Sequence, residues 1–552
     1  MKMKIQVFAV VCAAIFMGRA AEAATYTMTT SDDWTILENA VAGDIVEIAP
    51  GTYQFRVFLE NVGTADNPIV IRAQDPNNRP VWDLIGDESN RVSDAPGSYS
   101  AGDLGRGGWQ VGAEGAYYEI SGIIFRNCRD SSSAGMRMVN SGPVTLSDCL
   151  FEHNTNGLTG TSTDLVVEHC EFRENGKTFE GGNMTHNIYI YGGKFTMRYS
   201  FSHDSHEGQL FHIRAHESLL EYNWLARPSS YVGDIMSCNH LCGGEVFDQR
   251  MTLRGNVIIQ GTPQNGSQII ALYHDEGDPP TEMDITLLYN TIIGTPRGPG
   301  QTHRLLNLRN DSVDTHAHLH NNIIYQVGTV AEVDSPGMTN WSVEGANNWV
   351  TDGTDATDLT GTISGTDPGF SNAGALDFTL AAGAAAEDQA DTTVSGLPDR
   401  EYFEDETVTA RYRMRDSATD LGAFELGTNG GSYGPYDDEP VVDAGPDGDT
   451  DSDTDTDSDG DADSDTDTDA DGDSDGDTDG DSDTDADGDT DTDTDGDTDT
   501  DADGDTDADT DSTSEDGGPG SNEGESDSSC GCRMVGRGMG IDVMLNLIRI
   551  CS

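Results

Sequence analysis

LSDCLF (146–151), VEHCEF (167–172), MRYSFS (197–202), LEYNWL (220–225), LRGNVI (253–258), LLYNTI (287–292) and LHNNII (319–324) are copies of one short pattern. An apolar residue and two variable residues precede Cys, Ser or Asn, and mainly apolar residues follow. The fourth positions fall at 149, 170, 200, 223, 256, 290 and 322, so successive copies lie 21 to 34 residues apart. Internal repeats of this length are typical of solenoids, in which each repeat packs on its neighbours.

A second short apolar segment lies upstream of most copies, for example at 188–190, 211–213, 270–272 and 306–308. Alternation with a period of two and many Asn, Gly and Thr residues favour β-strands over helices. The recurring Asn suggests a ladder of side-chain amides, each bonded to the next. It could instead mark a turn that tolerates left-handed geometry. Both interpretations predict stacked β coils, with Asn256 directly beside Asn290.

These coils resemble the right-handed parallel β-helix of the pectate-lyase-like superfamily. Residues 33–41 and 43–53 resemble its capping helix and first coil, and 63–71 resemble its second coil. Residues 367–370, 377–380 and 420–425 resemble its closing turns. The resemblance implies an all-β fold: a single right-handed parallel β-helix over residues 24–428 with a short N-terminal capping helix. Because this fold hosts lyases, hydrolases, epimerases and inert adhesins, it does not define the chemistry.

The charge of the chain is strongly negative, with 100 Asp and Glu against 29 Lys and Arg, for a net charge of −71. This excess excludes electrostatic binding of nucleic acid, which requires cations to displace phosphate counterions. Residues 437–529 hold 42 acids and no base, and every odd residue from 447 to 511 is Asp. Like charges without an apolar face predict a disordered stalk over 429–529. Weak, diffuse calcium binding is the alternative, since spaced carboxylates are hard oxygen ligands.

The two ends of the sequence carry targeting features. Lys2 and Lys4 precede an apolar stretch that ends at AEA (21–23), which predicts a signal peptide over 1–23. CGCR (530–533) after an acidic stalk resembles the C-terminal sorting tails of myxobacterial surface proteins, although the apolar segment within 530–552 is short and interrupted. We therefore expect a secreted or outer-cell-surface protein, with no membrane-spanning segment in the mature body and a monomeric state.

Five cysteines remain in the body once the signal and the tail are set aside: Cys128, Cys149, Cys170, Cys238 and Cys242. Cys149 and Cys170 share one register on adjacent coils, so they could form a disulfide or stack as buried thiols. Cys238 and Cys242 could close a small loop, or bind zinc together with His240. Their redox states stay open at this stage.

Extra residues collect around 176–185, 240–250 and 274–284, on both sides of one strand position. That position covers 186–192, 209–214, 234–239, 268–273 and 304–309, and its sheet should form the floor of a cleft. If the apolar residues of each strand point inward, two columns of residues point outward. The columns are Tyr189, His212, Ser237, Ala271 and Asn307, and Tyr191, Arg214, Asn239, Tyr273 and Arg309.

Aromatic, His and Arg side chains on one face suit a sugar-acid chain, because Tyr stacks on sugars and Arg pairs with carboxylates. His or Tyr can transfer a proton near neutral pH. After the signal, the lysines are Lys177 and Lys194, and Lys177 lies in a flanking loop. The candidate catalytic residues are His212, Arg214, Tyr189 and Lys177. The candidate substrate-binding residues are Tyr191, Tyr273, Arg309, Asn239 and His186.

The sequence does not define a metal site, and His203 and His206 with Glu207 are only weak candidates for metal ligands. No cofactor is certain, and calcium could bridge an acidic substrate. The first hypothesis is a polysaccharide-lyase-like β-helix that acts on an extracellular acidic polysaccharide by β-elimination. The second is a non-catalytic carbohydrate-binding or adhesion protein. Hydrolysis by paired carboxylates is weaker, because Asp234 is the lone acid on the predicted strands.

Overall fold

In the computed structural model, described residues are 23–84, 107–129, 134–176, 185–237, 247–261, 267–273, 282–295, 302–309, 314–334, 338–403, 410–428 and 430–437. Residues 1–22 of the predicted signal peptide, the Asp-rich stalk from 447 onward and the tail at 530–552 lie outside these ranges and stay predictions. Cys238, His240 and Cys242 lie outside these ranges as well. Within the described ranges, no helix has the length and apolarity required to cross a membrane.

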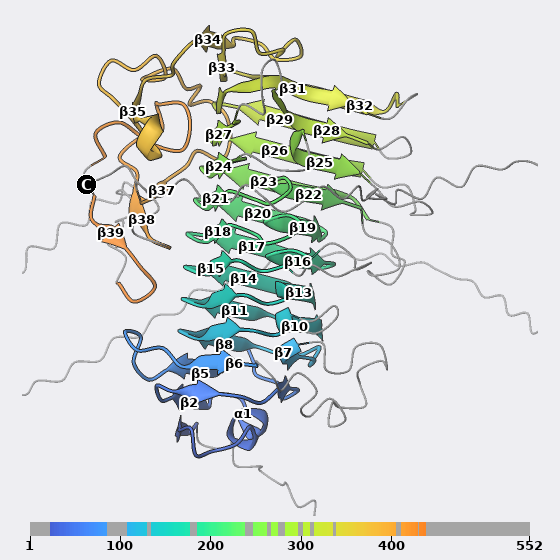
Figure 1. Cartoon of the computed structure of the whole chain (residues 1–552), viewed down its shortest axis with the longest axis vertical. Helices are drawn as coiled ribbons and strands as arrows, with labels where there is room; N and C mark the ends of the chain where they lie inside the picture. The colour runs from blue at the N-terminus through green and yellow to red at the C-terminus, as the bar shows by residue number, and fades with distance from the viewer. Residues whose placement is uncertain are drawn as a thin grey trace, which may run out of the picture. The chain divides into compact units, whose positions relative to one another are not determined.

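Three parallel sheets form the body of the molecule (Figure 1). From β2 (Ile45–Ile48) to β33 (Trp349–Thr351), successive strands belong to sheet A, then to sheet B, then to sheet C. Sheet A contains β1 (Thr25–Met28), β2 (Ile45–Ile48), β5 (Ile69–Ala73), β8 (Tyr118–Ser121), β11 (Val144–Ser147), β14 (Asp164–Glu168), β17 (Lys194–Arg198), β20 (Glu217–Glu221), β23 (Gln249–Arg254), β26 (Glu282–Leu288), β29 (Asp314–His320) and β32 (Trp341–Ala346).

Sheet B is built from the shortest strands: β3 (Thr52–Tyr53), β6 (Val81–Asp83), β9 (Ile124–Arg126), β12 (Leu150–Glu152), β15 (Glu171–Arg173), β18 (Phe201–His203), β21 (Trp224–Ala226), β24 (Val257–Ile259), β27 (Thr291–Ile293), β30 (Ile323–Tyr325), β33 (Trp349–Thr351) and β34 (Ile363–Gly365). Sheet C contains β4 (Val57–Leu59), β7 (Gly107–Val111), β10 (Ala134–Ser141), β13 (Asn156–Ser162), β16 (Ile188–Tyr191), β19 (Phe211–Arg214), β22 (Gly233–Met236), β25 (Gln268–Tyr273), β28 (His303–Leu308) and β31 (Val327–Val333).

This topology confirms the predicted parallel β-helix. The short helix α1 (Thr35–Asn39) lies at its N-terminal end (Figure 1). Apolar side chains from all three sheets fill the interior, where Phe125, Phe151 and Phe172 stack in successive coils with ring centroids 5.0 and 4.8 Å apart. Alternation along each strand therefore fixes which side chains face outward.

The recurring Asn forms the predicted ladder at the corner between sheets A and B. Asn256 Nδ2 donates to Asn290 Oδ1 at 2.9 Å, and the Asn256 backbone N–H donates to the same oxygen at 3.0 Å. The ladder is fully buried and continues in both directions along the stack. Its amides belong to Asn223, Asn256, Asn290, Asn322 and Asn348.

Earlier coils place Cys149, Cys170 and Ser200 at the ladder position. Cys149 and Cys170 are buried free thiols, and the Cys149 N–H donates to Cys170 Sγ at 3.4 Å. The stacked-thiol alternative is therefore confirmed for this pair. Burial raises the pKa of the Cys170 thiol well above its usual value, so the sulfur stays protonated.

After β34 the chain leaves the coils and runs back along sheet B as a strap of residues 366–437 (Figure 1). The strap contains β35 (Phe370–Asn372), the 3-10 helix η3 (Ala373–Ala375), β36 (Asp377–Leu380), β37 (Arg400–Tyr402), β38 (Tyr412–Met414) and β39 (Ser432–Tyr433). Its pairs β35–β36, β37–β38 and β38–β39 are antiparallel. The segments that we predicted as closing turns belong to this strap, and described structure continues past the boundary at 428.

Apolar side chains join the strap to the outer face of sheet B. Trp224 and Trp349 pack with Phe370, Phe378 and Tyr402 of the strap in one buried cluster. Left-handed residues at the corner between sheets A and B add polar contacts to the strap. These residues are Asp148, His169, Tyr222, Tyr289 and Asn321, which bond to Tyr436, Ala410, Asp399, Ala418 and Asp391 respectively.

Candidate functional site

Sheet C and the segment just before β16 bring six of the predicted site residues together with Asp234, which was not among them. The six are His186, Tyr189, Tyr191, His212, Arg214 and Tyr273. Tyr189 of β16 pairs with His212 of β19, and His212 pairs with Asp234 of β22. One step along the strands, Tyr191 pairs with Arg214. Tyr273 and His186 complete the group. We call His186, Tyr189, His212, Arg214, Asp234 and Tyr273 the His212 cluster.

The predicted columns were wrong on one strand. We placed Ser237 beside His212 and Asn239 beside Arg214, whereas Asp234 pairs with His212 and with Ala271, and Met236 pairs with Tyr273. Ile235 is the inward residue, because it pairs with Ile213 and Leu272, which are also fully buried. An outward Ser237 would instead have required Met236 to point inward. Asn239 itself lies outside the described residues.

The start of β22 explains why the register differs. The Phe211 ring lies over Gly233, where an added Cβ would approach Phe211 Cε2 to 2.0 Å. Gly233 therefore occupies an inward position that no larger residue could fill without moving the ring. With Gly233 and Ile235 inward, Asp234 must point outward toward His212. In the sequence, the spacing of Gly233 and Ile235 could have indicated that both residues point inward and that Asp234 points outward.

The hydrogen bonds of His212 define its protonation. Arg214 Nε donates to His212 Nε2 at 3.2 Å, and an arginine N–H can only donate. His212 Nε2 must therefore carry the lone pair, and the ring proton must lie on Nδ1. Nδ1 then donates to Asp234 Oδ2 at 3.1 Å. The imidazole is neutral, in one tautomer, with its basic nitrogen facing a guanidinium.

Aromatic rings surround this imidazole. The centroid of Tyr189 lies 4.6 Å from that of His212 at an interplanar angle of 78°, and His186 lies 4.8 Å from His212. Burial, the largest cause, and the positive charge of Arg214 hold the pKa of His186 well below 6.5, so His186 is neutral. Its Nδ1 accepts the Gln209 N–H at 3.4 Å.

The segment before β19 passes very close to His186. Gly208 has φ +74°, and an added Cβ would lie 2.0 Å from the Thr185 carbonyl oxygen and 3.0 Å from His186 Nδ1. Only glycine combines this backbone conformation with this separation. Gly208 therefore fixes how closely residues 205–209 approach the His212 cluster.

Asp234 was the lone acid on the predicted strands, and it was given no role from the sequence. Its Oδ2 accepts from His212 Nδ1 and from the Tyr273 hydroxyl, the latter at 3.2 Å. Its Oδ1 is buried without a hydrogen-bond partner among the described residues. Burial and the negative charge of Asp234 raise the pKa of Tyr231, which keeps that phenol protonated. Tyr231 is therefore a further member of the surroundings that alternation did not predict.

The remaining predicted residues lie apart from this group. Arg309 is exposed at the end of β28 and pairs with Asp334 at 3.0 Å. Lys177 lies outside the described residues, as do most of the loops that we expected to border a cleft. His203, a weak metal candidate, binds Glu171 and Asp204 instead. Within the described ranges, no group of three or more His, Cys, Asp or Glu side chains could hold a metal ion.

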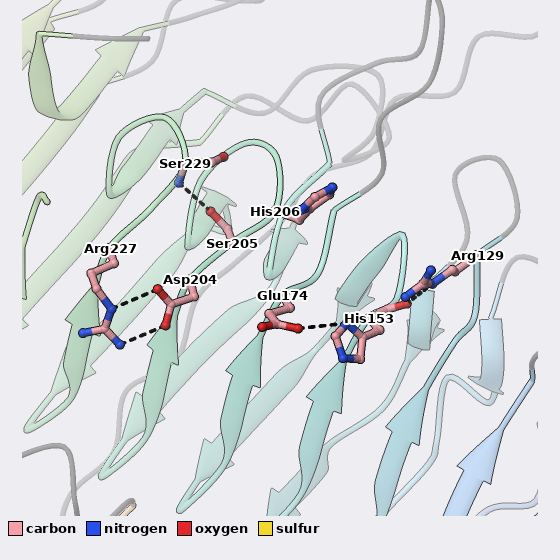
Figure 2. Close-up of a pocket in the computed structure, with 8 residues that line it drawn as sticks. All are labelled: Arg129, His153, Glu174, Asp204, Ser205, His206, Arg227 and Ser229. Atoms are coloured by element: carbon pink, nitrogen blue, oxygen red, sulfur yellow. Dashed lines mark hydrogen bonds and ion pairs between the residues drawn. The ribbon is translucent and has the colours of Figure 1, made fainter. Parts of the chain in front are cut away.

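A cavity of about 580 Å³ lies at the corner between sheets B and C, and Figure 2 shows its lining. Four of its charged or titratable side chains already pair with one another. Asp204 binds Arg227 through two bonds of 2.9 Å, and Glu174 lies 3.1 Å from His153. Ser205 Oγ donates to the Gly208 carbonyl at 3.1 Å, which links this corner pocket to the His212 cluster. The corner pocket therefore offers polar contacts beside the cluster.

Comparison with known proteins finds no matching family model and no matching curated protein. Among solved structures, pectate lyase Pel9A matches with a TM-score of 0.46 and 13% identity, over 73% of this chain and 96% of that one. The polysaccharide lyase family 6 enzyme Pedsa3628 from Pseudopedobacter saltans matches with a TM-score of 0.36 and 12% identity, over 72% and 99%. An alginate lyase from Paenibacillus sp. str. FPU-7 matches with a TM-score of 0.32 and 12% identity, over 62% of this chain and 99% of that one. Likeness at this level concerns the fold and transfers no residue roles.

Proposed function

We propose that this protein is an exported, surface-displayed β-helix that cleaves an extracellular acidic polysaccharide by β-elimination. One observation carries the proposal: Asp234 holds His212 as a neutral base whose Nε2 faces Arg214. A base next to a cation suits a substrate in which the proton to be removed is adjacent to a carboxylate. Export and surface display rest on the sequence features at the two ends of the chain.

In the proposed reaction, the Arg214 guanidinium binds the uronate carboxylate and stabilises the charge that develops when C5 loses its proton. His212 Nε2 accepts that proton, and Asp234 stabilises the resulting imidazolium. The electrons of the C5–H bond form the C4–C5 double bond, while the bond from C4 to the glycosidic oxygen breaks. Tyr189, whose ring packs on His212, gives a proton to the departing oxygen.

Tyr191 and Tyr273 would contact neighbouring sugars, because both are half-buried on the outer face of sheet C. Calcium would supply charge neutralisation between a polyanionic substrate and a body that is itself acidic. Outside 437–529 the chain has 58 acidic and 29 basic residues, so an acidic polymer would be repelled without a cation. The assay below therefore includes calcium.

The deciding experiment is an ultraviolet assay for the unsaturated uronate product. The purified protein is incubated with polygalacturonate, polymannuronate, polyguluronate and glucuronate polymers, with calcium and with a chelator. We expect product from at least one polymer, at a rate that His212→Ala abolishes. Sugar binding without product from any polymer would contradict β-elimination and would favour the adhesion protein.

A further inference from the structure

The bond between Arg214 and His212 has a consequence for substrate choice. We propose that Arg214 blocks the base in the free protein and that the substrate carboxylate unblocks it by drawing the guanidinium away. This inference rests on the proposed function and adds to it: the acid group of the sugar switches the base on. The protein should therefore select free uronates over their esters.

The blocking bond is fixed by chemistry on both sides. The Nε2 lone pair that would accept a proton already accepts the Arg214 Nε–H at 3.2 Å. Arg214 also donates through Nη1 to the Ser237 carbonyl oxygen at 3.1 Å, so the guanidinium is held in place. The opposite ring nitrogen is engaged with Asp234. In this arrangement neither nitrogen of His212 can accept a proton from a ligand.

Burial supports the same conclusion. His212 lies on an outward column, yet its side chain is only 8% exposed, and that of Asp234 is 2% exposed. Arg214 is 5% exposed and lies over the basic nitrogen. Access to His212 therefore requires Arg214 to move, and a carboxylate is the ligand that offers a guanidinium a stronger partner than imidazole.

The order of events follows from this exchange. The carboxylate first binds the guanidinium and frees the Nε2 lone pair at the same moment, next to C5. Proton abstraction then proceeds as described above, and Arg214 returns when the product leaves. A methyl ester lacks the anion that attracts Arg214, although its C5 proton is intrinsically the more acidic. Esters should therefore bind without reacting.

The first test measures access to His212 in the free protein, without any substrate. Diethyl pyrocarbonate acylates unprotonated imidazole, and mass spectrometry reports each histidine separately. His206 is exposed and serves as the reference within the molecule. We expect His212 to react slowly in the wild type and about tenfold faster in Arg214→Met, which keeps the bulk but removes the donor.

Tyr273→Phe is the matched control, because it removes the other donor to Asp234 Oδ2 and leaves Nε2 blocked. His212 should stay slow in that variant. Equal reactivity of His212 and His206 in the wild type, or no change in Arg214→Met, would overturn the proposal. Unchanged thermal melting shows that each variant is folded.

The second test compares one polymer with its methyl ester, using polygalacturonate if the panel identifies it. We expect the wild type to cleave the acid form and to leave the ester intact. Arg214→Met should lose activity on the acid form and gain activity on the ester, so that the ratio of kcat/KM values shifts by about 100-fold or more. A merely structural role for Arg214 would reduce both activities together.

The two tests separate the failure of this inference from that of the proposed function. Comparable cleavage of acid and ester by the wild type leaves β-elimination standing and refutes the block. Slow labelling that Arg214→Met releases, in a protein that cleaves no polymer, supports the block and refutes the lyase.

Discussion

Asp234 decides which nitrogen of His212 is basic, and the carboxylate is therefore as important to the proposed chemistry as the imidazole. Asp234→Asn should reduce kcat by a factor of about 10²–10⁴, because an amide can donate to Nδ1 and so favour the wrong tautomer. Initial rates on the best polymer measure the effect. Asp334→Asn, which alters the exposed partner of Arg309, is the control and should leave kcat unchanged. Equal rates in both variants would show that Asp234 does not orient the base.

His203 provides a pH-dependent prediction. Burial alone would lower its pKa, but hydrogen bonds to Asp204 and Glu171 outweigh burial and raise the pKa above 6.5. A raised folded-state pKa adds stability that is complete below 6.5 and is lost as pH rises through the folded value. His203→Gln should therefore lower the melting temperature clearly at pH 6 and much less at pH 9. His206→Gln is the control, and an equal deficit at both values would contradict the ion pairs.

Alternation along the strands predicted the outward positions of Tyr189, Tyr191, His212 and Arg214, because isoleucine or phenylalanine flanks each of them. It failed at residues 233–236, where Ile235 and Met236 are adjacent and both apolar. Hydropathy cannot tell which of two such neighbours packs inward. The close contact between Gly233 and the Phe211 ring settles the choice, and that contact is tertiary.

At the scale of elements, the Asn ladder explains how the corners hold left-handed residues. Tyr222, Tyr289 and Asn321 adopt φ values of 54° to 58° immediately before a ladder Asn. Such a conformation costs a non-glycine residue about 1–2 kcal/mol. The buried amide bonds offset that cost at these three corners. The recurrence of Asn made this element predictable, since identical positions in a repeat have identical neighbours.

Asn290→Ala should destabilise the coils, because it removes the acceptor of the Asn256 N–H and the amide that donates to the Leu253 carbonyl, both in the preceding coil. Each buried group left without a partner costs about 1–3 kcal/mol, so the free energy of unfolding should fall by several kcal/mol. Chemical denaturation measures the loss. Asn78→Ala, at an exposed turn, should behave as the wild type does. A similar loss in both variants would indicate that the ladder contributes nothing specific.

At the scale of the whole molecule, the strap is the feature that the repeat could not predict. Its residues form antiparallel pairs and lack the coil pattern, so they resembled closing turns. The clue was the composition of sheet B. Early strands such as β15 carry charged outward residues, whereas β21, β24 and β27 are apolar or small on both faces. A strand with two apolar faces requires a second covering layer.

A buried ion pair holds the strap together. Glu401 is fully buried, binds Arg413 Nε, and accepts the Glu425 N–H at 2.8 Å. Glu401→Gln should cost the strap about 3–5 kcal/mol, because it leaves the Arg413 charge uncompensated. Hydrogen exchange should then accelerate across 366–437 while the coils stay protected. The double variant with Arg413→Met should recover part of the loss, and Asp416→Asn is the exposed control. Uniform acceleration in the coils would show that strap and coils unfold as one unit.

The strap also sets an order of assembly. A ladder bond joins residues such as Asn256 and Asn290, 34 positions apart, so each coil can form as soon as it follows its predecessor out of the ribosome or a translocation pore. The hydrogen bond from the Tyr436 hydroxyl to Asp148 joins residues 288 positions apart, so it can form only after nearly the whole body has been synthesised. Until then, the apolar outer face of sheet B around Trp224 and Ile323 remains exposed to water and to other nascent chains. Docking of the strap is thus the last step of folding. A chain truncated before the strap would expose the apolar outer face of sheet B, which quality-control proteases and chaperones can recognise.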